Sequence, residues 1–497
     1  MSDITGPFYP IIYVRGYAMT QGEIDDTVST PYMGFNQGAT KIRQNWQGTI
    51  EKHIFESPLV RLMKDYGYQD NYHSRSDKGN KKLPAKSVII YRYYDQADTD
   101  FGNGDAPSIA QAAQGLHDLI LKTKQDVCGG DQVAQAQFKV YLVAHSMGGL
   151  ICRALLQNPN IGSVESTKLV DKVFTYGTPH NGIDMGGFNV PRLLGLWDIN
   201  NFNRDNMAEY LGLPNNANKV NSLNGSFDPK RFFCLIGTNY KDYSAGAGMS
   251  RRLAGEMSDG LVKISNAVVA GSPRAYVHRS HSGHYGLVNS EEGYQNLIRF
   301  LFGDYKVEGY IDVEALPLPP SVRSAHKKGK DIKASYYFEI SVSPRGALQY
   351  TLTERRKETF SAVIRKFDEL LRVDNIHGLN SPRSPYMFSI LLDSKKITSG
   401  RSLKFSADLA VSTTDYEIDR FLIPDRSIPS EYLFRDNLVV TLTPTVDGPK
   451  IRYRFSDDSW GESTGLDVSK DDKGLFIPMT SKKGFRAKLR LIVSRWS

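Results

Sequence analysis

The sequence predicts an α/β domain with a doubly wound, mostly parallel sheet, followed by an all-β domain. At 497 residues the chain is too long for one ordinary hydrophobic core, so two domains are expected. Up to Gly303, short apolar runs alternate with helical patterns, which is typical of βα repeats. Beyond Gly303, the runs alternate apolar with polar residues and are separated by turn residues, as in antiparallel sheets.

The strands of the first domain are expected where β-branched and aromatic residues form short runs. Most of these runs are almost continuously apolar, which predicts strands buried on both faces of a parallel sheet. They are residues 9–15, 86–94, 138–144, 169–177, 231–238 and 274–280.

Two helices of this domain are marked by apolar residues at helical spacing. The first runs over residues 109–120 and follows Asp105 and Pro107, which are suitable as a cap and a first-turn residue. The second begins near Ser290, has acidic residues in its first turn and ends at Gly303. We therefore expect an α/β domain over residues 1–305.

A change of composition predicts a domain boundary after this region. Residues 312–331 combine a proline cluster with a charge run, so we expect a linker over 306–333. Residues 334–497 contain period-2 segments, which predict an antiparallel sandwich or barrel. One helix is expected there, over 361–373.

Charge and cysteine content exclude several classes of protein. The net charge is +8, but the basic residues are dispersed, so no nucleic-acid partner is expected. The three cysteines show no CxxC or Cys/His ligand spacing, which indicates neither a disulfide framework nor a zinc site. We expect no metal and no cofactor.

The sequence indicates synthesis in the cytoplasm. No apolar run approaches the roughly 18 residues of a membrane-spanning helix. The first residues lack a basic segment, and Pro10 interrupts their apolar stretch, which argues against a signal peptide. Export by a route that needs no signal peptide stays open.

The strongest chemical signal is the stretch "YLVAHSMGGL", residues 141–150, which contains Ser146. An apolar strand leads into it and an apolar helix face follows it. A nucleophilic serine on a sharp strand-to-helix turn needs small residues two positions before and after, which here are Ala144 and Gly148. We therefore expect Ser146 to be a nucleophile.

In this setting "AHSMGG" resembles the nucleophile turn of α/β-hydrolase lipases and esterases. Residues 175–182, "TYGTPHNG", are similar to the segment that follows the next strand in many of them, and the resemblance covers roughly residues 8–303. The first strand ends in "YVRGY", where those lipases carry a His-Gly dipeptide and this chain has Arg15. The resemblance implies an oxyanion hole formed by the backbone N–H groups of Tyr17 and Met147.

In that fold the triad residues follow in the order serine, acid, histidine. Asp259 is the favoured acid, because "SDGLV" is similar to the acid turn of lipases. Asp242, which follows the strand over 231–238, is the alternative. A carboxylate at either place can orient the imidazole of the base.

The base is expected in the loop after the last strand, which contains three histidines. His284 is favoured because "GHYGLVNS" resembles the pattern around the catalytic histidine of small lipases, and His281 is the alternative. His278 is expected to be packed within the strand. His145 should point away from the reaction, and His180 is expected in the wall of the site.

The long insertions indicate the class of substrate. Residues 183–229 contain Leu193, Leu194, Leu196, Trp197 and Ile199, so we expect either a packed helical cap or a mobile lid over an acyl chain.

Residues 20–60 form a second insertion. Lys41 and Arg43, together with Arg15, suit an anionic head group, although solvated loop charges are the alternative interpretation. Phospholipid is therefore one hypothesis for the substrate.

Together these features predict a serine carboxyl-ester hydrolase of the lipase or phospholipase type that acts through an acyl-enzyme. The organisation also resembles lipases related to glycosylphosphatidylinositol deacylases, some of which are exported effectors. An acyltransferase with the same acyl-enzyme and a binding protein on a hydrolase scaffold are the alternatives. The expected partners are a lipid or other acyl ester, a membrane surface contacted peripherally, and a protein or second copy bound through the β-rich domain.

Overall fold

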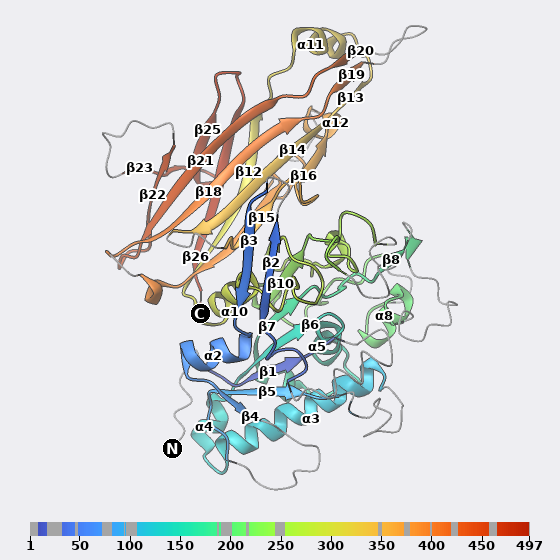
Figure 1. Ribbon diagram of the computed structural model, residues 1–497, viewed down its shortest axis with the longest axis vertical. Coiled ribbons are helices and arrows are strands. Elements are labelled where there is room, and N and C mark those ends of the chain that lie inside the picture. The colour runs from blue at the N-terminus through green and yellow to red at the C-terminus, as the bar shows by residue number, and fades with distance from the viewer. Residues whose placement is uncertain are drawn as a thin grey trace. The chain divides into compact units, whose positions relative to one another are not determined.

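The computed structural model describes the chain in segments (Figure 1). These are residues 8–16, 32–44, 48–71, 82–93, 95, 107–185, 188–189, 201–214, 218–243, 254–345, 350–371, 378–397, 400–418, 426–456 and 465–496. The chain divides into two compact units. The first comprises Met1–Arg274 and His278–Phe302, and the second comprises Ala275–Val277 and Gly303–Ser497.

The first unit is organised around a seven-stranded sheet with the order β11-β10-β7-β6-β1-β5-β4. All pairings from β4 to β10 are parallel. Every residue of β1, β5, β6 and β10 is buried, because both faces of the sheet are covered. The bounds are β1 Ile11–Val14, β4 Gln69–Asn71, β5 Ser87–Tyr91, β6 Val140–His145, β7 Val170–Tyr176, β10 Phe232–Gly237 and β11 Arg274–Val277.

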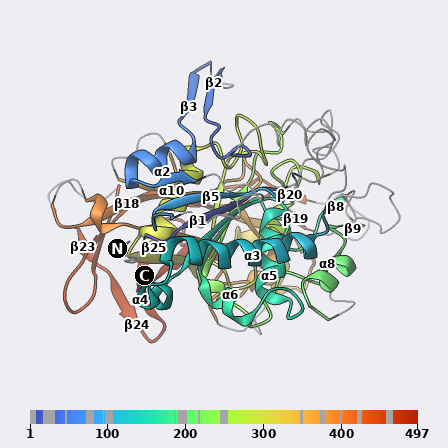
Figure 2. The same cartoon turned by 90° about the horizontal axis from the view of Figure 1, so that it is seen from below.

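Helices cover this sheet on both faces, with α2 and α10 on one side and α3 and α5 on the other (Figure 2). Their bounds are α2 Pro58–Tyr66, α3 Ile109–Cys128, α4 Gln132–Gln137, α5 Gly148–Gln157, α6 Val164–Leu169, α8 Arg204–Tyr210 and α10 Glu291–Phe302, with short 3₁₀ turns η2 Pro229–Arg231 and η4 Ile264–Asn266. This is the α/β-hydrolase arrangement, so the predicted fold class is confirmed. None of the helices in the described segments is long and apolar enough to cross a membrane.

The predicted strands and helices of this unit lie where the apolar runs placed them. Edge strand β4 was not predicted, because its polar sequence Gln69–Asn71 carries no apolar signal. The cap of α3 is Ser108, whose Oγ accepts a hydrogen bond from the N–H of Gln111 while the Gln111 side chain accepts one from the Ser108 N–H. Asp105 lies outside the described residues.

Two insertions interrupt the first unit. A hairpin of β2, Ala39–Gln44, and β3, Ile50–Phe55, follows β1. The expected cap or lid over 183–229 contains the short strands β8 Asp184–Met185 and β9 Phe188–Asn189 and the helix α8, which buries Met207 and Ala208. The apolar residues from Leu193 to Ile199 lie outside the described part of the chain.

The second unit consists of antiparallel sheets, as predicted, with two large sheets sharing one hydrophobic core. One has the order β17-β12-β26-β25-β24 and the other β15-β14-β18-β21-β22-β23, with β16 paired to β14. Ile311 and Leu489 of the first sheet share this core with Phe338 and Leu438 of the second. A small third sheet has the order β13-β19-β20.

The bounds of the second unit's elements are as follows. The strands are β12 Tyr305–Ala315, β13 Ile332–Lys333, β14 Ser335–Pro344, β15 Thr353–Arg355, β16 Val363–Lys366, β17 Tyr386–Leu392, β18 Leu403–Thr413, β19 Tyr416–Ile418, β20 Arg426–Ile428, β21 Tyr432–Thr443, β22 Lys450–Phe455, β23 Leu466–Asp467, β24 Ser469–Asp471, β25 Gly474–Thr480 and β26 Arg486–Arg495. The helices are α11 Pro320–Lys327 and α12 Phe367–Leu371, with the 3₁₀ turn η5 Ser394–Lys396.

Two expectations for this region were wrong. Residues 306–333 are not a linker throughout, because β12 lies between β17 and β26 in its sheet and buries alternate side chains. Residues 361–373 do not form one helix. The β-branched Val363 and Ile364 pair with β14 instead, because the tertiary pairing overrides the local helical spacing, and among the described residues of this range only Phe367–Leu371 are helical.

Lys172 on β7 should make the stability of the first unit depend on pH. Its Nζ donates to the carbonyl of Leu301 at 2.9 Å, and burial lowers the pKa of Lys172 from 10.5 to about 8. The unfolded chain therefore binds more protons between these two pH values, so this contribution to stability rises with pH across that window. Relative to Lys172→Met, the unfolding free energy of the wild type should rise by about 3 kcal/mol from pH 8 to 10.5.

Urea titrations of both proteins across this range measure the effect. Lys168→Met, at an exposed lysine of α6, is the control and should run parallel to the wild type. If the unfolding free energies of Lys172→Met and the wild type changed with pH in parallel, the buried amine of Lys172 would not titrate in this range.

Candidate active site

Ser146 sits on a sharp turn between β6 and α5, in a backbone conformation that residues other than glycine rarely adopt. Its φ is +52°, which costs about 1–3 kcal/mol for such a residue. The Ser146 N–H donates to the carbonyl of Tyr176 at 2.9 Å, and the Ser146 carbonyl accepts from Thr178 Oγ1 at 2.8 Å. Both partners belong to β7 and the residues just after it, so the neighbouring strand holds the turn in place.

Two glycines allow the end of β1 to pack directly against this turn. A Cβ on Gly148 would lie 2.1 Å from the carbonyl oxygen of Val14, and one on Gly16 would lie 2.3 Å from the Cβ of Ser146. Neither neighbour can yield, because one is backbone and the other is the serine itself. The small residue expected two positions after Ser146 is therefore required by contact with β1.

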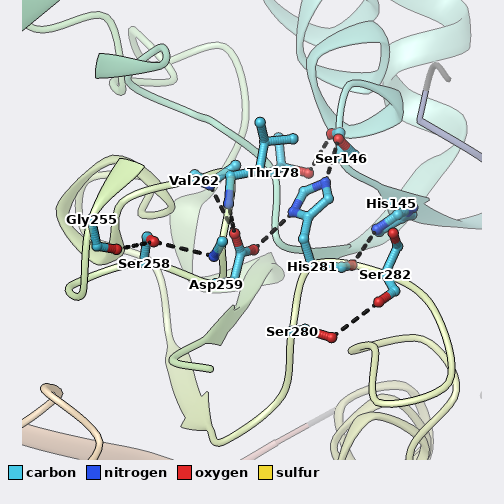
Figure 3. Close-up of polar contacts among 12 residues, drawn as sticks. His145, Ser146, Thr178, Gly255, Ser258, Asp259, Val262, Ser280, His281 and Ser282 are labelled. Carbon is cyan, nitrogen blue, oxygen red and sulfur yellow. Dashed lines mark hydrogen bonds and ion pairs between the residues drawn. The ribbon is translucent and has the colours of Figure 1, made fainter. Parts of the chain in front are cut away.

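His281 joins Ser146 to Asp259 through the two nitrogens of one ring (Figure 3). Its Nε2 is 2.9 Å from Ser146 Oγ, and its Nδ1 is 2.8 Å from Asp259 Oδ2. All three side chains are buried, with exposed fractions of 6% for Ser146, 3% for His281 and 1% for Asp259. Because a carboxylate only accepts, Nδ1 carries the proton and Nε2 faces the hydroxyl as an acceptor.

Asp259 is held by the backbone of its own turn. Its Oδ1 accepts from the N–H groups of Leu261 at 3.0 Å and Val262 at 2.8 Å, which leaves Oδ2 for His281. The His281 N–H also donates to the Asp259 carbonyl at 2.9 Å, so acid and histidine are linked by backbone as well as by side chains. The favoured acid is thus the one brought to the serine. Asp242 instead accepts a hydrogen bond from the Asn239 side chain.

The structure brings His281, and not the favoured His284, to Ser146 and Asp259. The loop after β11 closes on itself, because the Ser280 N–H donates to Tyr285 and the Leu287 N–H donates back to Ser280. His281 stands at the base of this loop, beside Asp259, whereas His284 is exposed at its far side. The local similarity of "GHYGLVNS" to the lipase pattern carries no information about how this loop closes.

The other histidines have different places. His278 is exposed just after β11, not packed inside the strand as expected. His145 points away from Ser146 Oγ, and its Nε2 lies 2.9 Å from the carbonyl of His281. Burial, with a smaller contribution from His281, holds the pKa of His145 well below its usual value. His145 is therefore neutral and donates through Nε2, which helps to fix the His281 backbone.

His180 is fully buried, with its Nε2 3.1 Å from Thr175 Oγ1. Burial, followed by the charge of Arg153, keeps its pKa well below the usual value. It packs edge-on to Phe232 and does not reach Ser146 in any described contact.

The structure describes one of the two expected oxyanion donors, Met147. Met147 follows the serine at the start of α5, and its N–H makes no hydrogen bond to any group in the described segments. That N–H is available to a ligand at Ser146. Tyr17 lies outside the described residues, so its part in an oxyanion hole stays a prediction.

Arg153 is a supporting residue that the sequence analysis missed. It is fully buried in α5, and its guanidinium donates to the carbonyls of His180 at 2.8 Å, Val220 at 2.6 Å and Ser222 at 2.9 Å. These bonds tie the helix behind the nucleophile to the segment after β7 and to the end of the 183–229 insertion. A single charge within the apolar run "GGLICRALL" was the available signal.

The fold and this arrangement define an α/β hydrolase with a lipase-like site. Among the described residues, no group of three or more His, Cys, Asp or Glu side chains could hold a metal ion.

Comparisons with known proteins agree with this class. Residues 74–188, which contain the Ser146 turn, match the PGAP1-like alpha/beta domain. The chain is similar to a lipase of Staphylococcus epidermidis, with 28% identity over 192 residues that cover 35% of this chain and 24% of that lipase. Lipase 1 of Staphylococcus aureus matches at 26% identity with the same coverage. The chain thus matches about a quarter of the length of these curated relatives.

Among solved structures, phospholipase PlaB from Legionella pneumophila is similar at 13% identity, with a TM-score of 0.34, over 81% of this chain and 86% of that chain. The similarity in sequence to bacterial lipases thus extends over about a third of this chain.

Gly148→Ala should destabilise the protein, because the added Cβ meets backbone at the strained turn. We expect a loss of about 2 kcal/mol or more, which is at the high end for single substitutions. Thermal unfolding of the purified variant measures it. Gly130→Ala is the matched control, since a Cβ there meets nothing within 4 Å, and it should stay within about 1 kcal/mol of the wild type. Equal stability of the two variants would contradict the close approach of β1.

Proposed function

We propose that this chain is a serine carboxyl-ester hydrolase that acts on lipid esters through a Ser146–His281–Asp259 triad. The observation that carries the proposal is the single buried imidazole within hydrogen-bond distance of both the serine hydroxyl and a carboxylate. This geometry is the one that activates a serine nucleophile. The similarity to lipases and the apolar surface described below support the lipid substrate.

In the proposed reaction, His281 Nε2 takes the proton of Ser146 Oγ as Oγ bonds to the ester carbonyl carbon. The carbonyl oxygen becomes an oxyanion, and the Met147 N–H donates to it. The imidazolium, stabilised by Asp259, then gives its proton to the departing alkoxide, which leaves an acyl-serine. A water molecule, deprotonated by the same imidazole, releases the fatty acid and restores the serine.

The proposal is tested first by covalent labelling. A fluorophosphonate probe should label the folded wild type at Ser146, because only an activated serine reacts with such a probe. Esterase activity should be lost in parallel with the labelling. Ser146→Ala should take up no label. A folded wild type that stays unlabelled would favour a non-catalytic binding protein on this scaffold. Transfer of the acyl group to an added alcohol in preference to water would instead indicate an acyltransferase.

The choice of base is tested by comparing two histidines three residues apart in one loop. His281→Ala should lower kcat/KM for a soluble ester by about three orders of magnitude or more, because the triad acts as a unit. His284→Ala should leave it nearly unchanged, since His284 is exposed. Steady-state kinetics on a short-chain ester decides between them, and the reverse pattern would overturn the assignment of His281.

The β2–β3 hairpin supports a substrate that lies in a lipid surface. Ile42, Ile50 and Ile54 are 67%, 64% and 71% exposed, which is unusual for three large apolar side chains on one small element. Their register places them on one face, with Ile42 opposite Lys52, Ile54 opposite Thr40 and Ile50 opposite Gln44. An apolar face that includes an exposed lysine is suited to an anionic lipid surface.

The hairpin is firmly attached at its base. Ala39 and Phe55 are buried there, and a Cβ on Gly38 would lie 2.3 Å from the Phe55 carbonyl oxygen. The Phe55 ring packs against Tyr294 of α10 with a centroid distance of 6.3 Å. Figure 2 shows the hairpin extending beyond α2. A fixed base and an apolar outer part are what a peripheral membrane contact requires.

Removing this apolar face should separate activity on lipid from activity on soluble esters. Each isoleucine that leaves water stabilises the contact by roughly 1–2 kcal/mol, so Ile42→Ser with Ile54→Ser should lower hydrolysis of vesicle-borne ester about tenfold or more. Hydrolysis of a soluble short-chain ester should not change. Val133→Ser with Val164→Ser removes equally exposed apolar side chains from α4 and α6 and is the control. Equal loss in both double variants would contradict a role for the hairpin.

A further inference from the structure

A cavity of about 450 Å³ lies on the second unit's larger sheet, over β18, β21 and β22. Its volume is in the range of small-molecule sites, about 300–1,000 Å³. Four cationic side chains line it, namely Arg345, Lys404, Arg452 and Arg454, and no carboxylate does so among the described residues. Such a concentration of like charge is unfavourable in the empty protein, so it calls for an explanation by ligand binding.

Strand register explains how these cations meet. Lys404 of β18 is opposite Thr441 of β21, and Thr441 is in turn opposite Arg452 of β22. Neighbouring strands are about 4.8 Å apart, so the backbones of Lys404 and Arg452 are separated by about 10 Å. Arg454 is two residues further along β22 and faces the same side, about 7 Å away. Three long cationic side chains can therefore reach one ligand above Thr441.

Arg345 joins this group from the end of β14. Its N–H donates to the carbonyl of Lys404 at 2.9 Å, which fixes its backbone beside β18. Figure 1 shows β14, β18, β21 and β22 side by side in one sheet, as the pairing register requires. The four cations thus come from two strands, β18 and β22, and from the residue that follows a third, β14.

Little of this charge is neutralised within the described part of the chain. Arg452 Nε is 3.0 Å from Asp467 Oδ1, and the same oxygen is 3.8 Å from Lys450 Nζ, so one carboxylate serves two cations. Arg345, Lys404 and Arg454 form no ion pair with any described residue. Among the described residues, the cavity keeps an excess of positive charge that an anion would compensate.

Hydroxyl groups supply further donors at the floor of the cavity. Ser402, Thr441 and Thr443 line it, and Ser402 Oγ is hydrogen-bonded to Thr443 Oγ1 at 2.6 Å. Guanidinium forks, an ammonium and hydroxyls together match the several oxygens of a phosphate group, which accepts from many donors at once. A single carboxylate would leave most of these donors unused.

We propose that this cavity binds a multiply phosphorylated ligand, either a soluble polyphosphate or the phosphorylated head group of a lipid. The binding site lies wholly in the second unit and does not depend on the chemistry of Ser146. It assigns a binding role to a domain whose fold alone implies none.

Calorimetric titration of the full chain tests the proposal, with inositol hexakisphosphate and pyrophosphate as probes at low and at physiological salt. The wild type should bind the hexakisphosphate, and Lys404→Glu with Arg454→Glu should weaken that binding about tenfold or more. Lys470→Glu with Lys473→Glu makes the same change in net charge at exposed positions on and just after β24 and should bind like the wild type. Hydrolysis of a soluble ester by both variants controls for folding of the first unit, and circular dichroism controls for the second.

Sedimentation with phosphatidylcholine vesicles, with and without phosphatidylinositol bisphosphate, distinguishes the two sources. Recruitment only by the phosphorylated lipid, reversed by the soluble probe, supports a head-group site. Binding of the soluble probe without recruitment supports a soluble ligand. The proposal is overturned if the wild type binds neither probe nor vesicle, or if both double variants lose binding equally, since the latter would reflect net charge alone. Neither result bears on labelling of Ser146.

Discussion

The positive φ of Ser146 is the constraint on which the site depends. This backbone conformation costs about 1–3 kcal/mol relative to an unstrained one, so the turn would relax if nothing held it. It persists because β1 closes in from one side at Gly16 and Gly148, while β7 and Thr178 hold the serine's own N–H and carbonyl from the other. The parallel sheet is therefore more than a support: three neighbouring strands must be in register before the serine can be presented.

Burial gives the rest of the site its chemistry. The serine, histidine and acid are almost inaccessible to water, and the Asp259 carboxylate and the backbone of Ser146 and His281 have fixed partners. Neutral His145 holds the His281 carbonyl, and Arg153 fixes the helix behind the nucleophile by donating to backbone carbonyls. An unpartnered polar group in such a place would cost about 1–3 kcal/mol, so these contacts position the site and stabilise it together.

The two units use exposed surface in opposite ways. The first presents isoleucines on a hairpin with a buried base, which suits contact with hydrocarbon. The second presents cations and hydroxyls around a cavity, which suits phosphate. Both features are unfavourable for an isolated protein in water. Contact with lipid or with an anionic ligand would offset that cost, which links the two proposals through the same physical argument while their tests remain independent.

The sequence by itself determined the α/β order of the first unit, the β-rich nature of the second, the serine turn and the acid turn. These follow from local periodicity and from small residues at required positions, as "YLVAHSMGGL" and "SDGLV" show. Only the tertiary structure decided the rest. His281, not His284, faces Asp259 because the loop closes on itself. β12 formed where a linker was expected because two strands were available to pair with it, and β16 replaced part of an expected helix for the same reason. Each outcome depends on partners distant in the chain, and local patterns carry no information about them.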